Sequence, residues 1–303
     1  ACSAGPPCDD VVPRVIAYLL NLATLVGIFG ILAASMNIMV GYAGIFSVAH
    51  AVFFGVGAYT AAQLALHLSA DLLVALPVAM ALSAALPLAI AMPALRVRDE
   101  YFVIASLGLQ MFATTLFSEA PALTGGVGGL VGIPRPTLLG VEMTSGVSLA
   151  IVVLAVLALV LAATWLLMRG SFGRSLMAIR DSETAALALG KNVAMLKLLA
   201  VCVSCAFAGA AGGLYAFHLA FVNVDSFTLE TSMLIVAMVI VGGVGTLAGP
   251  IVGVVVLMLL PAALSFLPFI PPNQIGVVQQ GIYGAAMTLL MIYRPAGIVG
   301  RAG

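Results

Sequence analysis

The sequence predicts an all-α integral membrane protein: a polytopic bundle of about 8–10 transmembrane helices, with some glycine-rich segments broken or re-entrant. Hydrophobic residues make up 63% of the chain and charged residues 7%, whereas a soluble protein carries about 25% charged residues. Apolar runs of roughly 20 residues, enough to cross a bilayer as a helix, recur along the chain. These runs lack the apolar–polar alternation of membrane-spanning strands, so the spans are predicted to be helices.

The chain is predicted to consist of a polar N-terminal tail at 1–10 and a single transmembrane domain at 11–303. The tail contains Cys2 and Cys8, which can form a disulfide if the tail is extracytoplasmic. The 11 basic and 11 acidic residues cancel. The composition therefore gives no sign of a large basic surface that could bind nucleic acid.

The first span is predicted at 15–40, where Asn21 and Asn37 are the strongly polar interior residues. The stretch that follows, 41–59, is rich in glycine and also contains Ser47, His50 and Tyr59. Glycine at this density is typical of a broken or closely packed element, so a plain lipid-facing helix is not expected here.

The next span, 72–95, contains three prolines and is predicted to be kinked. A charged turn at 96–100 leads into a span that ends near Phe117, and a glycine-rich connection follows at 118–146. That connection has no lysine of a phosphate-binding loop, so we interpret it as a bend at the membrane surface.

The second half is predicted to hold spans at 147–168, 194–217, 231–260 and 275–293. The third of these is interrupted by glycines between 242 and 250, which is expected to divide it into two spans.

Residues 171–192 are the longest stretch in which polar residues are frequent. Asp181 and Ser182 are good N-cap residues for a short helix, and Gly190 can close that helix in the left-handed conformation. Leu176 and Ile179 lie three apart and share a helix face. The pattern predicts a compact capped element outside the membrane, suited to docking. The alternative is an ordinary connecting loop whose arginines only anchor it on the cytoplasmic side.

The order of residues in this stretch resembles the coupling loop of permeases of the branched-chain amino acid ABC transporter family. The matching positions are Gly173, Arg174, Ala178, Arg180, Asp181, Glu183, Ala185, Ala186 and Gly190. Further stretches resemble the family in the same order: 41–59, the charged turn, the glycine-rich connection and the 242–250 interruption.

The resemblance implies that the coupling loop (residues 171–192) inserts into a groove on a separate ATP-binding subunit, with Ala185 and Ala186 meeting that groove. The implied partners are two ATP-binding subunits, a second and often non-identical permease subunit, and an extracytoplasmic substrate-binding protein. ATP and magnesium would then be held by partner subunits, and this chain would bind no cofactor. The family imports leucine, isoleucine and valine, while relatives import other amino acids, urea or aromatic acids.

The basic residues indicate the orientation. With the coupling loop cytoplasmic and nine alternating spans, nine of the eleven basic residues fall on the cytoplasmic side, and only Arg14 and Arg135 fall outside. This agrees with the positive-inside rule. The family resemblance implies a multi-pass protein of the bacterial inner membrane.

No catalytic or metal-binding constellation is visible. The chain has no complete phosphate-binding loop and no clustered metal ligands, so ATP hydrolysis by this chain is not expected. A self-sufficient secondary transporter or channel remains the competing class, although acidic residues within the spans are scarce. Residues expected near a translocation path are Asn37, Ser47, His50, Gly55 and Tyr59. The alternative is that the glycines of this stretch only let helices pack and that His50 is a structural hydrogen-bond partner.

Overall fold

The computed structural model describes residues 11–68, 71–94, 99–138, 141–143, 146–265, 275–293 and 297–299. The predicted N-terminal tail lies outside the described residues, as do Arg96 and Arg98 of the charged turn. The α-helices are α1 (Val11–Asn37), α2 (His50–Leu68), α3 (Leu72–Ala94), α4 (Asp99–Glu119), α5 (Pro121–Thr124), α6 (Gly146–Arg169), α7 (Ser171–Asp181), α8 (Glu183–Ala188), α9 (Val193–Leu219), α10 (Leu229–Gly242), α11 (Gly249–Ser265) and α12 (Ile275–Tyr293).

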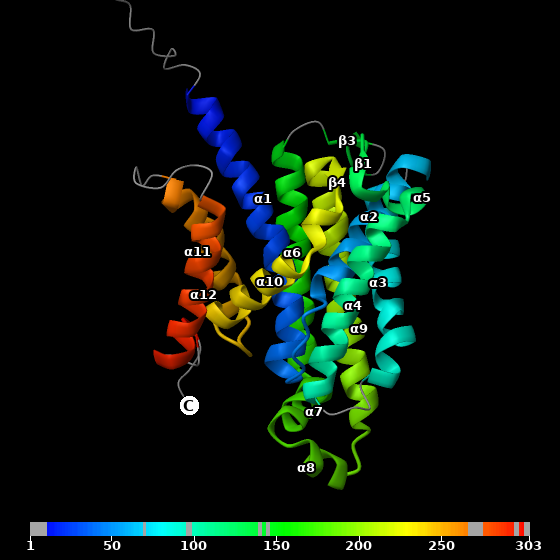
Figure 1. Cartoon of the computed structure of the whole chain (residues 1–303), viewed down its shortest axis with the longest axis vertical. Coiled ribbons are helices and arrows are strands. Elements are labelled where there is room, and N and C mark those ends of the chain that lie inside the picture. The colour runs from blue at the N-terminus through cyan, green and yellow to red at the C-terminus, as the bar shows by residue number, and fades with distance from the viewer. Residues whose placement is uncertain are drawn as a thin grey trace, which may run out of the picture.

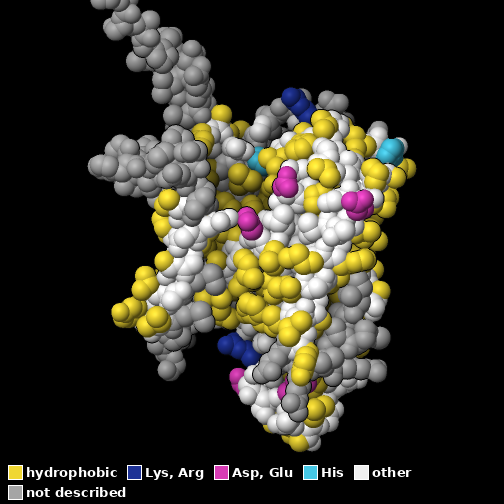
Figure 2. All heavy atoms as spheres, in the orientation of Figure 1, with side chains coloured by type: hydrophobic (Ala, Val, Ile, Leu, Met, Phe, Trp, Pro, Cys, Tyr) yellow, Lys and Arg dark blue, Asp and Glu magenta, His cyan; other side chains and the backbone are white. Residues whose placement is uncertain are grey.

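The prediction of an all-α polytopic fold is confirmed (Figure 1). In the described part of the chain, α1, α2, α3, α4, α6 and α9 are long and apolar enough to cross a membrane, and α10 and α11 are shorter apolar helices. Figure 2 shows a hydrophobic band across the middle of one face, with charged side chains toward the upper and lower ends.

Helix α9 lies at the centre of the bundle and packs against α1, α2 and α3. Small residues allow this contact. A Cβ atom added at Gly57 of α2 would lie 2.2 Å from the carbonyl oxygen of Gly209 in α9. A Cβ added at Gly212 would lie 2.0 Å from the carbonyl oxygen of Phe54. The two backbones therefore touch directly, as small residues permit in membrane helix pairs.

The predicted break after the first span is present, and it is short. Helix α1 continues through a π-helical turn (Ile38–Tyr42), residues 43–49 are not regular helix, and α2 then runs unbroken from His50. The His50 Nε2 atom lies 2.8 Å from Ser35 Oγ. Because Ser35 precedes Tyr42 by two helical turns, α2 begins about 10 Å inside the end of the first helix.

Polar side chains from distant helices accept hydrogen bonds from backbone N–H groups at this break. The Val48 N–H donates to Ser106 Oγ of α4 at 3.1 Å. The Ala51 N–H donates to Ser232 Oγ of α10 at 3.0 Å, and that hydroxyl donates in turn to Gln110 Oε1 at 3.1 Å. Irregular backbone is tolerated at membrane depth only when protein surrounds it and satisfies it, as it does here.

Four short strands lie at the end of the bundle opposite the coupling loop (Figure 1). Strand β1 (Leu130–Val131) pairs antiparallel with β4 (Phe221–Val222), and β2 (Thr137–Leu138) with β3 (Val141–Glu142). The glycine cluster before β1 makes tight turns: Gly129 has φ 70°, and a Cβ there would lie 2.4 Å from the Val222 carbonyl oxygen. The chain does turn sharply in this connection; that the bend lies at the membrane surface stays a prediction.

Labelling from one side of the membrane tests the predicted orientation. Val127, in the turn after α5, is 83% exposed, and Leu189, just after α8, is 77% exposed. In a background without the four native cysteines, Val127→Cys should react with an impermeant maleimide added outside the cell. Leu189→Cys should react only after the membrane is opened. Reaction of both cysteines from the same side would contradict the orientation.

Candidate coupling site

The coupling loop folds into two short helices, α7 and α8, which protrude from the lower end of the bundle (Figure 1). Ser182 is the N-cap of α8, and its Oγ accepts a hydrogen bond from the Ala185 N–H at 3.3 Å. Gly190 (φ 74°) ends the helix: its N–H donates to the Leu187 carbonyl, and the Lys191 N–H donates to the Ala186 carbonyl. This pair of bonds is a Schellman motif. Of the two predicted N-cap residues, Ser182 is the cap, whereas Asp181 ends α7. The predicted helix stop at Gly190 is confirmed.

One face of the coupling loop is buried against the chain itself. Ile179, Ala186 and Val193 form a small apolar cluster outside the main core, and Leu176 is buried in the main core. The Ala186 side chain is 2% exposed. The expectation that Ala186 meets a partner's groove therefore needs correction, because its methyl group faces α7 and α9 rather than solvent.

The opposite face is exposed and partly apolar. Met177, Leu187 and Leu189 are 38%, 55% and 77% exposed. The neighbouring Ala178 and Ala185 are also exposed. Because this segment is predicted to lie outside the membrane, its exposed apolar side chains form a candidate protein-binding surface.

Two contacts hold the loop ends against the bundle. The buried Lys197 of α9 forms an ion pair with Glu183 at 2.8 Å. The exposed Arg174 donates to the Arg169 carbonyl at the end of α6 at 3.2 Å. A Cβ at Gly173 would lie 2.2 Å from the Met168 carbonyl oxygen, so only glycine fits this close to α6. Asp181, the last residue of α7, is exposed.

A third contact joins the coupling loop to the helix break. Arg180 Nη1 donates to the Gly41 carbonyl in the π-helical turn. Beside it, Asn37 accepts a hydrogen bond from the Gly245 N–H at 2.9 Å and donates to the Thr246 carbonyl at 2.9 Å. We call these five residues the Arg180 junction. The junction connects α7, the end of the first helix, and the turn between α10 and α11.

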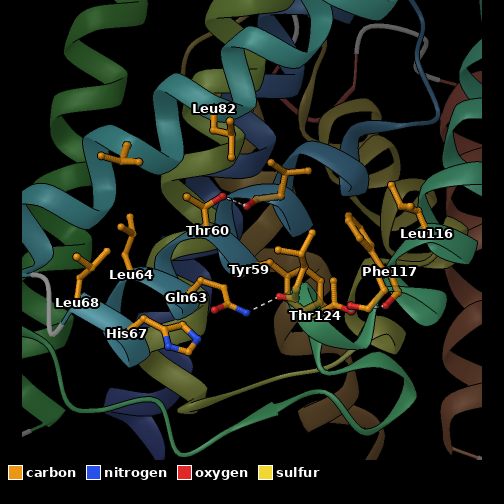
Figure 3. A pocket seen from close by; sticks show the side chains of 14 residues that line it. Tyr59, Thr60, Gln63, Leu64, His67, Leu68, Leu82, Leu116, Phe117 and Thr124 are labelled. Carbon is orange, nitrogen blue, oxygen red and sulfur yellow. Dashed lines mark hydrogen bonds between the residues drawn. The ribbon is translucent and has the colours of Figure 1, made fainter.

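Among the cavities in the described part of the chain, two adjoin α2. The larger, about 480 Å³, is mostly apolar and is lined by Tyr59, Gln63 and Phe117 among others (Figure 3). The smaller, about 160 Å³, is lined by Ser47 and Ser106 near the helix break. Thus Ser47 and Tyr59, two of the predicted path residues, each face a cavity.

The other predicted path residues line neither cavity. His50 is fully buried and contacts Ser35. A Cβ at Gly55 would lie 2.9 Å from the rings of both Phe117 and Phe227, so this glycine makes room for aromatic packing. Asn37 belongs to the Arg180 junction.

Comparison with known proteins identifies the family. Residues 18–293 match the family described as "Branched-chain amino acid transport system / permease component". The chain belongs to this family. It is 30% identical, over 92% of its length and 69% of the relative's, to "High-affinity branched-chain amino acid transport system permease protein LivM" of Escherichia coli strain K12.

Two further relatives of this permease component are more distant. It is 23% identical, over 69% of its length, to "Probable branched-chain amino acid transport permease protein LivM" of Methanocaldococcus jannaschii. It is 30% identical, over 52% of its length and 45% of the relative's, to "Autoinducer 2 import system permease protein LsrC" of Klebsiella pneumoniae. No solved structure shows significant similarity to the chain.

Sequence reasoning missed several residues of the permease that tie the site together. Lys197 is one of the nine basic residues that the orientation places on the cytoplasmic side; the structure shows that it is 6% exposed and pairs with Glu183. Gly245 and Thr246 were expected only to separate two spans, yet they bind Asn37. The available signal was Asn37 itself, because a strongly polar residue deep in an apolar span usually has a specific partner.

Proposed function

We propose that this chain is the transmembrane permease subunit of an ATP-driven ABC importer for branched-chain amino acids, in the bacterial inner membrane. It works with two ATP-binding subunits, a second permease subunit and an extracytoplasmic substrate-binding protein. The chain itself performs no chemistry: ATP and magnesium are held by the ATP-binding subunits.

The observation that carries this proposal is the shape of the coupling loop. It is capped at both ends of α8, held to the bundle by Lys197, and presents Leu187 and Leu189 on its free face. An ordinary loop gains little from fixing its backbone, since ordering each residue costs about 1–2 kcal/mol. A rigid protruding surface can transmit the movement of an ATP-binding subunit to the helices of the bundle.

The substrate class follows the family and the relatives named for branched-chain amino acid transport. Within the described spans, the buried polar residues include serines, threonines, Asn37, Gln110 and His50, with Lys197 near the loop. We therefore assign most of the substrate selection to the binding protein and the passage itself to weak contacts near Ser47 and Tyr59.

Reconstitution tests the proposal. The permease, its partner permease and the ATP-binding subunits are placed in liposomes with ATP enclosed, and leucine-loaded binding protein is added outside. We expect uptake of radiolabelled leucine that requires both ATP and the binding protein. Uptake that continues without ATP, driven by an ion gradient, would contradict the proposal and favour a secondary transporter.

A further inference from the structure

The Arg180 junction brings together three segments that are far apart in the sequence. Arg180 Nη1 donates to the Gly41 carbonyl across 139 positions of sequence. Asn37 holds the turn at Gly245 and Thr246 across more than 200 positions, through one donated and one accepted bond. Each of these segments begins or ends a helix, so the junction sits where the helices can pivot.

Glycines allow the approach. A Cβ at Gly41 would lie 2.2 Å from Asn37 Oδ1 and 2.6 Å from the Gly245 nitrogen. Gly44 has φ 71°, and a Cβ there would lie 3.1 Å from Arg180 Cγ. Gly245 has φ 78°, and a Cβ there would lie 3.1 Å from Arg180 Nη1. The arginine side chain therefore lies along backbone that only glycine can form at this distance.

Each segment at the junction leads to a different part of the bundle. Arg180 is in the last turn of α7, within the coupling loop. Gly41 lies just before the 43–49 break, whose Ser47 lines the smaller cavity. The Gly245 turn joins α10 to α11 and is further held by the C-terminal turn, where the Ile298 and Val299 N–H groups donate to the Val241 and Gly242 carbonyls at 3.0 Å.

We propose that Arg180 is the positioning residue that carries movement of the coupling loop to the helix break and to the α10–α11 turn. This inference rests on the proposed function and adds the route within the chain. A hydrogen bond from a guanidinium to a carbonyl is charge-assisted and stronger than a neutral one. Asn37 couples the two responding segments, so a pull on Gly41 also reaches the α10–α11 turn.

The test separates coupling from assembly in the reconstituted complex. Arg180→Met keeps the aliphatic stem beside Gly44 and removes the donor. We expect ATP-binding subunits to remain bound and ATP hydrolysis to continue, while leucine uptake per ATP hydrolysed falls about tenfold, the effect of losing one charge-assisted hydrogen bond. Arg180→Lys retains a donor and should recover part of the ratio. Arg135→Met, the same substitution at an exposed arginine of the 118–146 connection, outside the coupling loop, should keep the wild-type ratio.

The other possible outcomes distinguish failure of this proposal from failure of the proposed function. A wild-type ratio in Arg180→Met would overturn the proposal, and so would loss of the ATP-binding subunits, because Arg180 would then serve docking. If Arg180→Met does not accumulate as a folded membrane protein, Asn37→Ala decides: the same uncoupling supports the route, and a wild-type ratio defeats it. Absence of ATP-driven uptake in the wild-type complex would instead reject the proposed function.

Discussion

Replacing Leu189 with aspartate should release the ATP-binding subunits from the permease and abolish ATP-driven uptake. Leu189 is 77% exposed and follows α8 on the free face of the coupling loop, beside Leu187 at 55%. An apolar anchor at the centre of an interface is typically worth 2 kcal/mol or more, so the ATP-binding subunits should bind about 30-fold more weakly. Co-purification with a tagged ATP-binding subunit measures this.

The matched control is Leu189→Met, which keeps an apolar side chain of similar volume and should co-purify normally. The variant permease should still insert and melt like the wild type, because the Leu189 side chain is outside the core. Normal co-purification of the aspartate variant would show that this face does not bind the ATP-binding subunit.

Replacing Gly57 with valine should destabilise the whole bundle. A Cβ at Gly57 would lie 2.2 Å from the Gly209 carbonyl oxygen and 2.4 Å from its Cα, so α2 and α9 must separate. Since α9 also packs against α1 and α3, the shift reaches the centre of the core. Overpacking typically costs 1–3 kcal/mol, and we expect a loss of about 3 kcal/mol because backbone cannot move aside. The apparent melting temperature in detergent, with size-exclusion chromatography as the readout, measures this loss of stability.

Gly108 of α4 provides the control. A Cβ there would have no atom within 4 Å, so Gly108→Val should melt within error of the wild type. Equal melting temperatures for Gly57→Val and Gly108→Val would contradict the direct backbone contact between α2 and α9.

Local chemistry explains what could be predicted from the sequence. The N-cap at Ser182 and the left-handed stop at Gly190 depend on neighbouring residues only, so both could be placed before the fold was known. The division of 231–260 into α10 and α11 followed from the glycines between them. The apolar runs predicted the spans because the thickness of the bilayer sets the length of a transmembrane helix.

Contacts between distant segments could not be predicted in the same way. Ala185 and Ala186 are adjacent and chemically identical, and only the position of α8 against α7 and α9 determines that Ala186 is the buried one. Asn37 was expected near a path, but its partners lie more than 200 residues away, in a turn whose place depends on how α10 and α11 pack on α1. Gly55 was grouped with the path because glycine has no side chain to reveal that it makes room for Phe117 and Phe227.

A photo-cross-linking amino acid at position 189 tests most directly whether the coupling loop binds the ATP-binding subunit. In cells that produce the whole complex, illumination should join the permease to an ATP-binding subunit when the cross-linker is at 189. The same cross-linker at 127, in the exposed turn at the opposite end of the bundle, should give no such product. A cross-link to the ATP-binding subunit from position 127, or none from position 189, would contradict the assignment of residues 171–192 as the coupling loop.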